Sequence, residues 1–277
     1  MRVLVTSASG ANGDGYGALL SFGLDGAPLG PFSDDPRIAD PRGLSVSPDR
    51  RHLYVNSGSD RVLALDTRGI VMRDTGPVPG LNAGGGIFGA DGRYYVGLRS
   101  ARSIAAFSPA LDGPAKPVLP SGVVPFPRGF AFDADGRLFL ASGIGPGGEG
   151  ENTIAVFDAR GQLSSPRFIS DDAVSPLDLI VAPNGNVLVS SEFPFGKADA
   201  VATIREYDGA TGRLVRVFAA DPNTRFQRPR GLRFGPGGNL FCVARDNVLA
   251  FDFADGRCLG PIIAMPKLNG QAIAFFA

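Results

Sequence analysis

The sequence predicts an all-β fold, a six-bladed β-propeller with four antiparallel strands in each blade. Three observations predict it: one motif recurs five times, each copy holds a tight turn between two apolar strands, and the two chain ends complement each other. Among the 277 residues, the copies begin at residues 41, 83, 127, 176 and 229. Consecutive copies start 42 to 53 residues apart, a repeat length that is typical of propeller blades.

Each copy of the motif contains the pattern of four short strands. In blade 2 we expect strands at residues 44–47, 52–56, 62–66 and 70–74. Four of the five copies have Asp-Gly, Asn-Gly or Gly-Gly in the first turn, dipeptides that accept the positive φ angles of tight hairpins. One such sheet cannot bury its apolar faces alone, so the blades must pack around an axis. The copies place blades 2 to 6 at residues 41–76, 83–118, 127–170, 176–219 and 229–264.

Blade 1 has to be assembled from both ends of the chain. Residues 271–275 match the inner strand of the other copies, for example residues 128–132, but no turn or second strand follows them. The chain begins with the missing strands, at residues 2–6, 18–23 and 28–32. Residues 271–277 and 1–36 therefore form blade 1, which closes one domain of residues 1–277 and leaves no free sheet edge at the junction.

Composition excludes several classes of partner. Apolar residues make up 44% of the chain, and 27 Lys and Arg residues balance 27 Asp and Glu residues. This balance predicts no general attraction to nucleic acid or to an anionic membrane. The apolar run at residues 2–5 is too short for a signal peptide or a membrane span. We therefore expect a cytoplasmic protein, and the sequence leaves its oligomeric state open.

The two cysteines are expected to be reduced. Cys242 and Cys258 fall in the second and fourth strands of blade 6. Two strand spacings, about 9–10 Å, exceed the limit of roughly 7 Å between the Cα atoms of a disulfide. The sequence predicts that both thiols serve as small apolar side chains rather than as nucleophiles or metal ligands.

Arginines are predicted to gather at one end of the central channel. The inner strand of each blade begins at the face that we call the top, and the tight turns lie at the opposite, bottom face. The residues just before the inner strands should surround the top mouth: Gln271, Arg42, Gly84, Arg128, Leu177 and Arg230. Loops after the second strands add Arg99 and Arg245. Converging guanidinium groups indicate a site for an anionic or polar small molecule. Alternatively, these arginines pack over the blade junctions and pair with carboxylates.

Two carboxylates are candidates for proton transfer near this mouth. Asp178 occupies a position where the other copies have glycine or alanine, and Glu192 follows the second strand of the same blade. Burial and charged neighbours shift the pKa of a carboxyl group in opposite directions, so either residue can act as a general acid or base. The alternatives are a structural counter-ion for Asp178 and a solvated loop carboxylate for Glu192.

Three long loops are expected at the top face, at residues 9–17, 143–152 and 192–202. They are candidate lids, with Tyr16, Phe193 and Phe195 as an apolar underside, although ordinary loop packing explains these aromatic residues equally well. The stretch Asn12–Gly15 faintly resembles a calcium loop but lacks the acidic ligands that should follow it. We expect no cofactor and no dedicated metal ligands; a divalent ion such as calcium is conceivable but not indicated.

The motifs Pro-x-Gly-Leu-x-Phe, Asp-Gly and aromatic-Asp-x-x-Gly resemble those of NHL-repeat propellers and, more loosely, of gluconolactonase-like and strictosidine-synthase-like six-bladed propellers. The resemblance covers essentially the whole chain and implies the fold more strongly than any function. Gluconolactonase-like enzymes hold a divalent ion with Glu, Asn and Asp, whereas Arg42, Arg128 and Arg230 stand at comparable positions in this chain. Peptide-amidating and streptogramin lyases depend on histidines, but the single histidine, His52, lies at a bottom turn.

The sequence favours an enzyme of the lyase or hydrolase type that acts on an anionic or polar small molecule without histidine catalysis. The lone histidine excludes Ser-His-Asp and Cys-His arrangements. The alternatives are a non-catalytic ligand-binding module and a protein-interaction scaffold.

Overall fold

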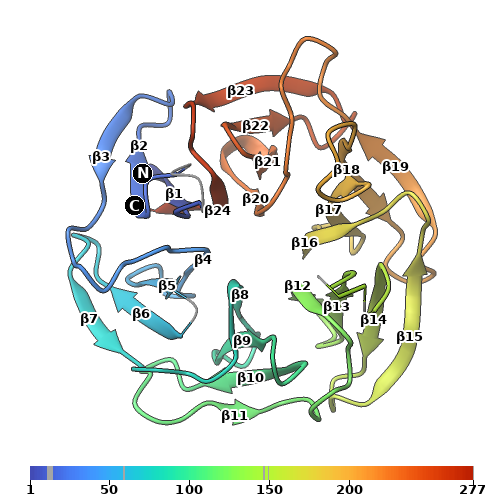
Figure 1. The fold of residues 1–277 in the computed structure, drawn as a ribbon, viewed down its shortest axis with the longest axis horizontal. Helices are drawn as coiled ribbons and strands as arrows, with labels where there is room; N and C mark the ends of the chain where they lie inside the picture. Colours follow the sequence, from blue (N-terminus) through green and yellow to red (C-terminus); the bar gives the residue numbers. More distant parts are fainter. Residues whose placement is uncertain (11–14, 59, 146, 149, 277) are drawn as a thin grey trace.

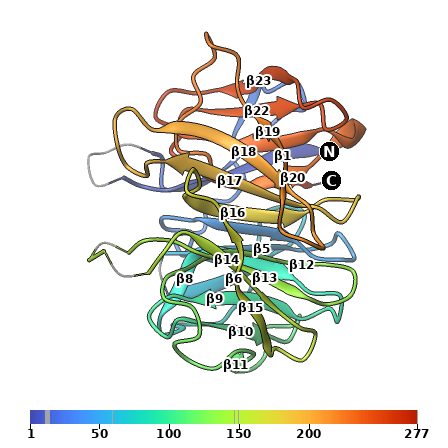
Figure 2. The same ribbon diagram turned by 90° about the vertical axis from the view of Figure 1, so that its right-hand side faces the viewer.

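Six four-stranded antiparallel sheets surround a central axis in the computed structural model of the chain (Figure 1). The structure describes residues 1–10, 15–58, 60–145, 147–148 and 150–276. The sheets are the six blades that the sequence predicts. Seen edge-on, the strands of each blade run between the two faces of the ring (Figure 2).

Each blade extends outward from an inner strand that lies next to the axis (Figure 1). In this order, blade 1 consists of β24 (Gly270–Phe276), β1 (Arg2–Ser7), β2 (Ala18–Phe22) and β3 (Pro28–Pro31). Blade 2 consists of β4 (Gly43–Val46), β5 (Leu53–Ser57), β6 (Arg61–Leu65) and β7 (Val71–Asp74). Blade 3 consists of β8 (Leu81–Phe88), β9 (Tyr94–Leu98), β10 (Ser103–Phe107) and β11 (Lys116–Pro117).

Blade 4 consists of β12 (Pro127–Phe132), β13 (Leu138–Ser142), β14 (Thr153–Phe157) and β15 (Leu163–Ser170). Blade 5 consists of β16 (Pro176–Val181), β17 (Val187–Phe193), β18 (Val201–Tyr207) and β19 (Leu214–Phe218). Blade 6 consists of β20 (Leu232–Phe234), β21 (Leu240–Val243), β22 (Asn247–Phe251) and β23 (Cys258–Ala264), with a short 3₁₀ turn at Pro236–Gly238. In the described ranges no helix is long and apolar enough to cross a membrane.

The last strand closes the ring, as predicted. β24 pairs with β1 in antiparallel register, with Ile273 opposite Val5, and the two chain ends lie side by side (Figure 1). Thr6 strengthens the closure: its hydroxyl accepts a hydrogen bond from the Ala272 amide at 3.0 Å and donates one to the Arg42 carbonyl at 2.8 Å. A single side chain therefore links both ends of the chain to blade 2.

The hydrophobic core lies between the blades. Among the described residues, six clusters of buried apolar side chains each span one junction between neighbouring blades. Between blades 1 and 2, for example, Leu4 of β1 packs in one cluster with Leu44 and Leu53 of β4 and β5. Because every blade is covered on both faces by its neighbours, burial of apolar surface depends on the complete ring.

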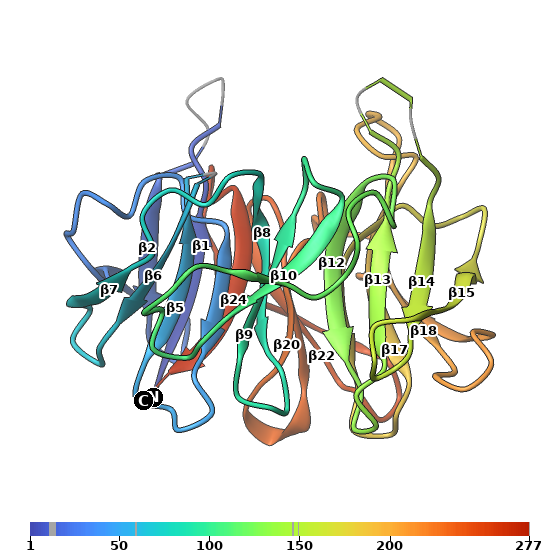
Figure 3. The same ribbon diagram turned by 90° about the horizontal axis from the view of Figure 1, so that it is seen from below.

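The turns between the first and second strands lie at the bottom face. Gly92, Gly136 and Gly185 have φ between 76° and 83°, and in blade 2 Arg50 takes the equivalent position with φ of 59°. The chain termini lie at this face, whereas the loops that follow β1 and β13 leave the ring at the opposite, top face (Figure 3). This arrangement agrees with the predicted assignment of the two faces, and it places His52, 4.0 Å from Asp49, at the bottom.

The two cysteines are free and buried. Cys242 lies in β21 and Cys258 in β23, with β22 between them. Burial raises the pKa of the Cys242 thiol far above its ordinary value. The Cys242 thiol is therefore protonated and suited to packing rather than to nucleophilic chemistry.

Replacing Ile273 by alanine should destabilise the fold by about 2–5 kcal/mol, because its fully buried side chain fills the junction between blades 6 and 1 at the closing strand. Urea unfolding followed by circular dichroism measures the loss. The control is Val217→Ala on the outer strand β19, where the side chain is 42% exposed and the change should stay within about 0.5 kcal/mol. Equal effects of the two substitutions would contradict the importance of the closure.

Candidate functional site

A small cavity occupies the upper part of the central channel. Its volume is about 70 Å³, which is room for a few water molecules. Five of the eight predicted site residues line it: Arg99, Arg128, Asp178, Arg230 and Gln271. The other three, Arg42, Glu192 and Arg245, lie outside its lining.

Arg128 is the most deeply buried of the predicted arginines. Arg128 is 8% exposed. Its guanidinium carbon lies 5.5 Å from the centre of the Phe126 ring and 4.8 Å from the centre of the Phe195 ring. One terminal nitrogen donates to the Ile144 carbonyl at 3.3 Å, while the buried Nε has no acceptor within the described residues. A β-carbon at Gly143 would come within 1.9 Å of this Nε, so the glycine makes room for the arginine. The fold thus holds a cation with unused donor capacity in an apolar setting.

Aromatic rings lie beside three of the arginines at the mouth. Arg99 lies 5.0 Å from the centre of the Phe126 ring, and Arg230 lies 5.9 Å from that of Phe195. Arg99, Phe126, Arg128, Phe195 and Arg230 therefore alternate in one row, which we call the arginine–phenylalanine stack. Each such contact contributes about 0.5–2 kcal/mol of cation–π attraction.

The stack concentrates positive charge. Burial, together with the neighbouring guanidinium groups, lowers the pKa of Arg128 to about 10 and that of Arg230 to about 10. Burial and the charge of Arg42 also lower the pKa of Arg99. In the described part of the chain, the Arg230 side chain has the Phe195 ring beside it and the charge of Glu192 nearby, which opposes the decrease. A bound anion would relieve this mutual repulsion.

The remaining predicted ligand-binding residues have other contacts. Arg42 pairs with Asp40 at 3.1 Å, which corresponds to the alternative in which such arginines meet a carboxylate, although its charge still acts on the stack. Gln271 lines the cavity, but its amide donates to the Asn269 carbonyl at 2.8 Å. The backbone amide of Arg245 donates to the Gln227 carbonyl, outside the cavity.

Glu192 is buried rather than solvated. Glu192 is 5% exposed, and its Oε1 accepts a hydrogen bond from the Arg228 amide at 2.7 Å. The other oxygen, Oε2, has no hydrogen-bond partner within the described residues. The nearby charge of Glu192 raises the pKa of Arg230. Glu192 is therefore placed to hold the charged form of Arg230, and it keeps one oxygen available as an acceptor.

Asp178 lies at the floor of the cavity and links two blades. Its Oδ2 accepts a hydrogen bond from the Leu232 amide of blade 6 at 3.1 Å and lies 3.7 Å from the guanidinium of Arg233. Burial raises the pKa of Asp178, against the opposing charge of Arg233. The carboxylate thus combines a structural bond between blades with a raised pKa at a cavity lined by arginines.

Arg233 is a residue of the channel that the sequence pattern did not single out. This residue of β20 donates to the Leu232 carbonyl at 2.6 Å and, across the axis, to the Leu44 carbonyl of blade 2 at 3.2 Å. It therefore spans the channel below Asp178. A signal was present, because the residues aligned with Arg233 in the other blades are uncharged: Ser45, Ile87, Ala131, Ile180 and Ala274.

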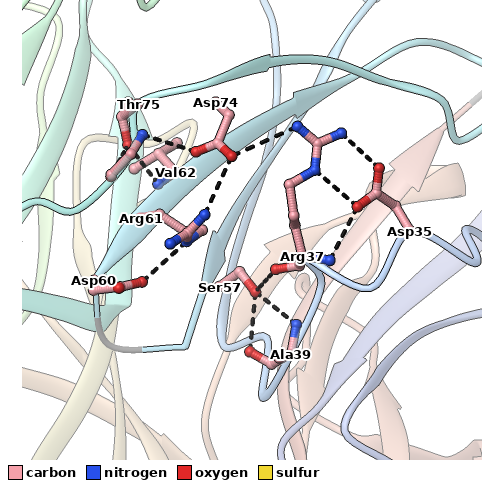
Figure 4. Close-up of polar contacts among 10 residues, drawn as sticks. Asp35, Arg37, Ala39, Ser57, Asp60, Arg61, Val62, Asp74 and Thr75 are labelled. Atoms are coloured by element: carbon pink, nitrogen blue, oxygen red, sulfur yellow. Dashed lines mark hydrogen bonds and ion pairs between the residues drawn. The ribbon is translucent and has the colours of Figure 1, made fainter.

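Two arginines at the outer rim are matched by carboxylates. At the outer rim, Asp74 lies 3.6 Å from Arg37 and 3.3 Å from Arg61, and each of these arginines has a second aspartate partner, Asp35 or Asp60 (Figure 4). These pairs fasten the connection between blades 1 and 2 to the outer strands of blade 2. Arg128 differs from these rim arginines, because its buried Nε has no acceptor within the described residues.

A divalent cation of the kind held by gluconolactonase-like enzymes does not fit this mouth. Four arginines line it, whose guanidinium groups repel a cation and provide no lone pairs for coordination, and Asp178 is the single carboxylate among its described lining residues. The described residues also contain no group of three or more His, Cys, Asp or Glu side chains close enough to bind a metal. Within the stretch that resembles a calcium loop, residues 12–14 lie outside the described residues.

Two of the three candidate lids contribute to the stack. The loop at 192–202 supplies Phe195, which lies beside Arg128 and Arg230, and the loop at 143–152 supplies Gly143 and the Ile144 carbonyl. In the loop at 9–17, the Tyr16 hydroxyl donates to the Pro266 carbonyl at 3.4 Å. Closure of these loops over the mouth stays a prediction.

Replacing Asp178 by glycine should destabilise the protein by about 2–4 kcal/mol, because the change removes the acceptor of the Leu232 amide and leaves Arg233 without its counter-charge. Chemical unfolding measures the effect. The matched control is Asp135→Gly in an exposed bottom turn, for which we expect less than about 1 kcal/mol. A gain in stability for Asp178→Gly would show that its carboxylate is not a strut.

Comparison with solved structures places this chain among six-bladed propellers. A protein of unknown function from Bacteroides caccae superposes with a TM-score of 0.70 at 13% identity, over 98% of this chain and 97% of that one. The periplasmic gluconolactonase of Pseudomonas aeruginosa gives a TM-score of 0.60 at 18% identity, covering 100% and 99%. Virginiamycin B lyase from Staphylococcus aureus gives 0.59 at 15%, covering 98% and 88%. No protein-family model and no curated protein sequence matches the chain. At these identities the similarity establishes the fold.

Proposed function

We propose that this protein is an enzyme of the lyase or hydrolase type that acts, without histidine catalysis, on a small anionic molecule held at the top mouth. One observation carries the proposal: the guanidinium groups of Arg128 and Arg230 are held near each other, the pKa of both is lowered, and the Nε of Arg128 has no acceptor within the described residues. A structural arginine in a neutral protein would be expected to meet a carboxylate, as those at the outer rim do.

The mouth suits an anion for electrostatic reasons. A carboxylate or phosphate placed by Arg128 and Arg230 receives planar, charge-assisted donors and offsets the repulsion between the two cations. Phe195 contacts both arginines and would cover the ligand from above. A covered site contains less water, which strengthens each of these interactions.

The same residues supply the elements of acid–base catalysis. Asp178 lines the cavity with a raised pKa, so it can donate or accept a proton nearer to neutral pH than an exposed aspartate. Arg128 and Arg230 would stabilise negative charge that develops on the substrate. Glu192, whose Oε2 has no hydrogen-bond partner within the described residues and whose charge acts on Arg230, is the second proton-transfer candidate.

Two of the similar structures support an enzymatic function by their names, since one is a gluconolactonase and another a virginiamycin B lyase. The present chain would differ from a metal-dependent enzyme by using fixed arginines in place of an ion. We keep the cytoplasm as the proposed location because both thiols are free, although the gluconolactonase from Pseudomonas aeruginosa is periplasmic.

Small carboxylates and phosphates should raise the melting temperature of the full chain, and the increase should disappear in Arg128→Ala and Arg230→Ala. A ligand present at a hundred times its Kd stabilises by about 2.7 kcal/mol, or roughly 5 °C for a domain of this size. Thermal unfolding against a panel of metabolite carboxylates, phosphates and lactones, with a chelator present, measures the shift. Added salt should weaken it.

The control is Arg68→Ala, which removes an arginine with a 77% exposed side chain far from the channel and should keep the full shift. If Arg128→Ala and Arg230→Ala also keep it, the two arginines are structural and the proposal fails. A ligand that shifts the melting temperature but is not converted by concentrated enzyme would identify a binding module instead.

A further inference from the structure

A second and larger cavity opens at the bottom end of the channel. Its volume is about 620 Å³, within the range of about 300–1,000 Å³ that small-molecule sites occupy. All six blades contribute to its walls, because the lower halves of the inner strands converge there. Arg233, which also lines the upper cavity, reaches across the axis between the two spaces.

The walls of this bottom cavity are mainly apolar and only partly buried. Large side chains that keep some exposure surround it on every side: Val46, Ile87, Phe88, Phe132, Ile180 and Phe275. Apolar surface that faces a water-filled channel is unfavourable, and an apolar ligand that covers it gains about 25 cal/mol for each Å² removed from water. The cavity therefore favours a ligand with an apolar body.

The charged groups of the cavity favour an anionic end on this ligand. Arg233 has five N–H donors, and its contacts are the carbonyls of Leu232 and Leu44 and the Asp178 carboxylate at 3.7 Å, beyond hydrogen-bond distance. The other charged lining residues are Arg50, whose Nη2 lies 3.4 Å from the Phe275 carbonyl, and Asp133.

Asp133 does not balance these two cations, because Arg137 already pairs with it at 2.6 Å. Asp178, 3.7 Å from Arg233, offsets part of the charge of this arginine, and Arg50 adds a second cation, so the described charged groups around the cavity still leave positive charge for a ligand. Arg233 stands at the closed end, where a terminal carboxylate can reach the donors that the backbone carbonyls leave unused.

We propose that the bottom cavity binds an amphipathic monocarboxylate of medium chain length, with its carboxylate at Arg233 and its chain along the apolar walls. This site is distinct from the mouth at the top face. It does not depend on the function proposed there, because Arg128 and Arg230 do not line it.

Isothermal titration of the full chain with octanoate tests this site, with octanol as the uncharged match. We expect saturable binding of one octanoate and binding of octanol at least tenfold weaker. Arg233→Met should weaken octanoate binding at least tenfold. Ala134→Trp, which adds bulk at an exposed position of the rim, should abolish it without disturbing the core. Arg128→Ala should leave it unchanged.

Three results would overturn the proposal. Octanoate that fails to bind the folded protein, or that binds in several copies, would remove the site. Equal affinity for octanol would show that the carboxylate of the ligand does not contribute to binding. Binding that Arg128→Ala abolishes and Ala134→Trp preserves would place octanoate at the mouth instead. Since the Ala134→Trp and octanol comparisons do not involve Arg233, the proposal can still be decided if Arg233→Met fails to fold.

Discussion

The close approach of the inner strands at the axis is the constraint on which the rest of the structure depends. A β-carbon at Gly129 would lie 2.6 Å from the Cα of Asp178 in the next blade, and one at Gly231 would lie 2.7 Å from the Cα of Ala272. These distances leave no space for a side chain, so the repeated glycine sets how tightly the ring can close. The narrow channel that results brings residues from several blades within reach of one another.

Two charged residues that depart from the repeat lie close together in this channel. Asp178 replaces a glycine or alanine of the other copies in blade 5, and Arg233 replaces an uncharged residue in blade 6. The two side chains meet at 3.7 Å and hold three blades together through Leu232 and Leu44. A charge placed alone at either position would be costly to bury, so each substitution makes the other tolerable. Their meeting also divides the channel into a cationic upper part and an apolar lower part.

The repeat allowed the fold to be predicted almost completely, down to strand ends within one residue in blade 2, because period, turn glycines and chain ends are local properties of the sequence. The site was predictable only in part. Position in the repeat located Arg128 and Arg230, but not the turn of Arg42 toward Asp40 or the burial of Glu192 beneath the Arg228 amide. These outcomes depend on which side chains from different blades meet, and a linear pattern does not carry that information.

The arginine–phenylalanine stack at the top mouth lowers the stability of the folded protein, and this cost bears on its function. Burying Arg128 near Arg230 requires removing two cations from water, and burial together with neighbouring guanidinium groups lowers the pKa of both. Contacts with Phe126 and Phe195 recover part of this cost, but cation–π attraction does not neutralise charge. A carboxylate paired with Arg128 would offset more of this cost, as Asp74 does for the rim arginines. Arg128 therefore carries a positive charge that its described neighbours compensate only in part, and the proposed anion site rests on this observation.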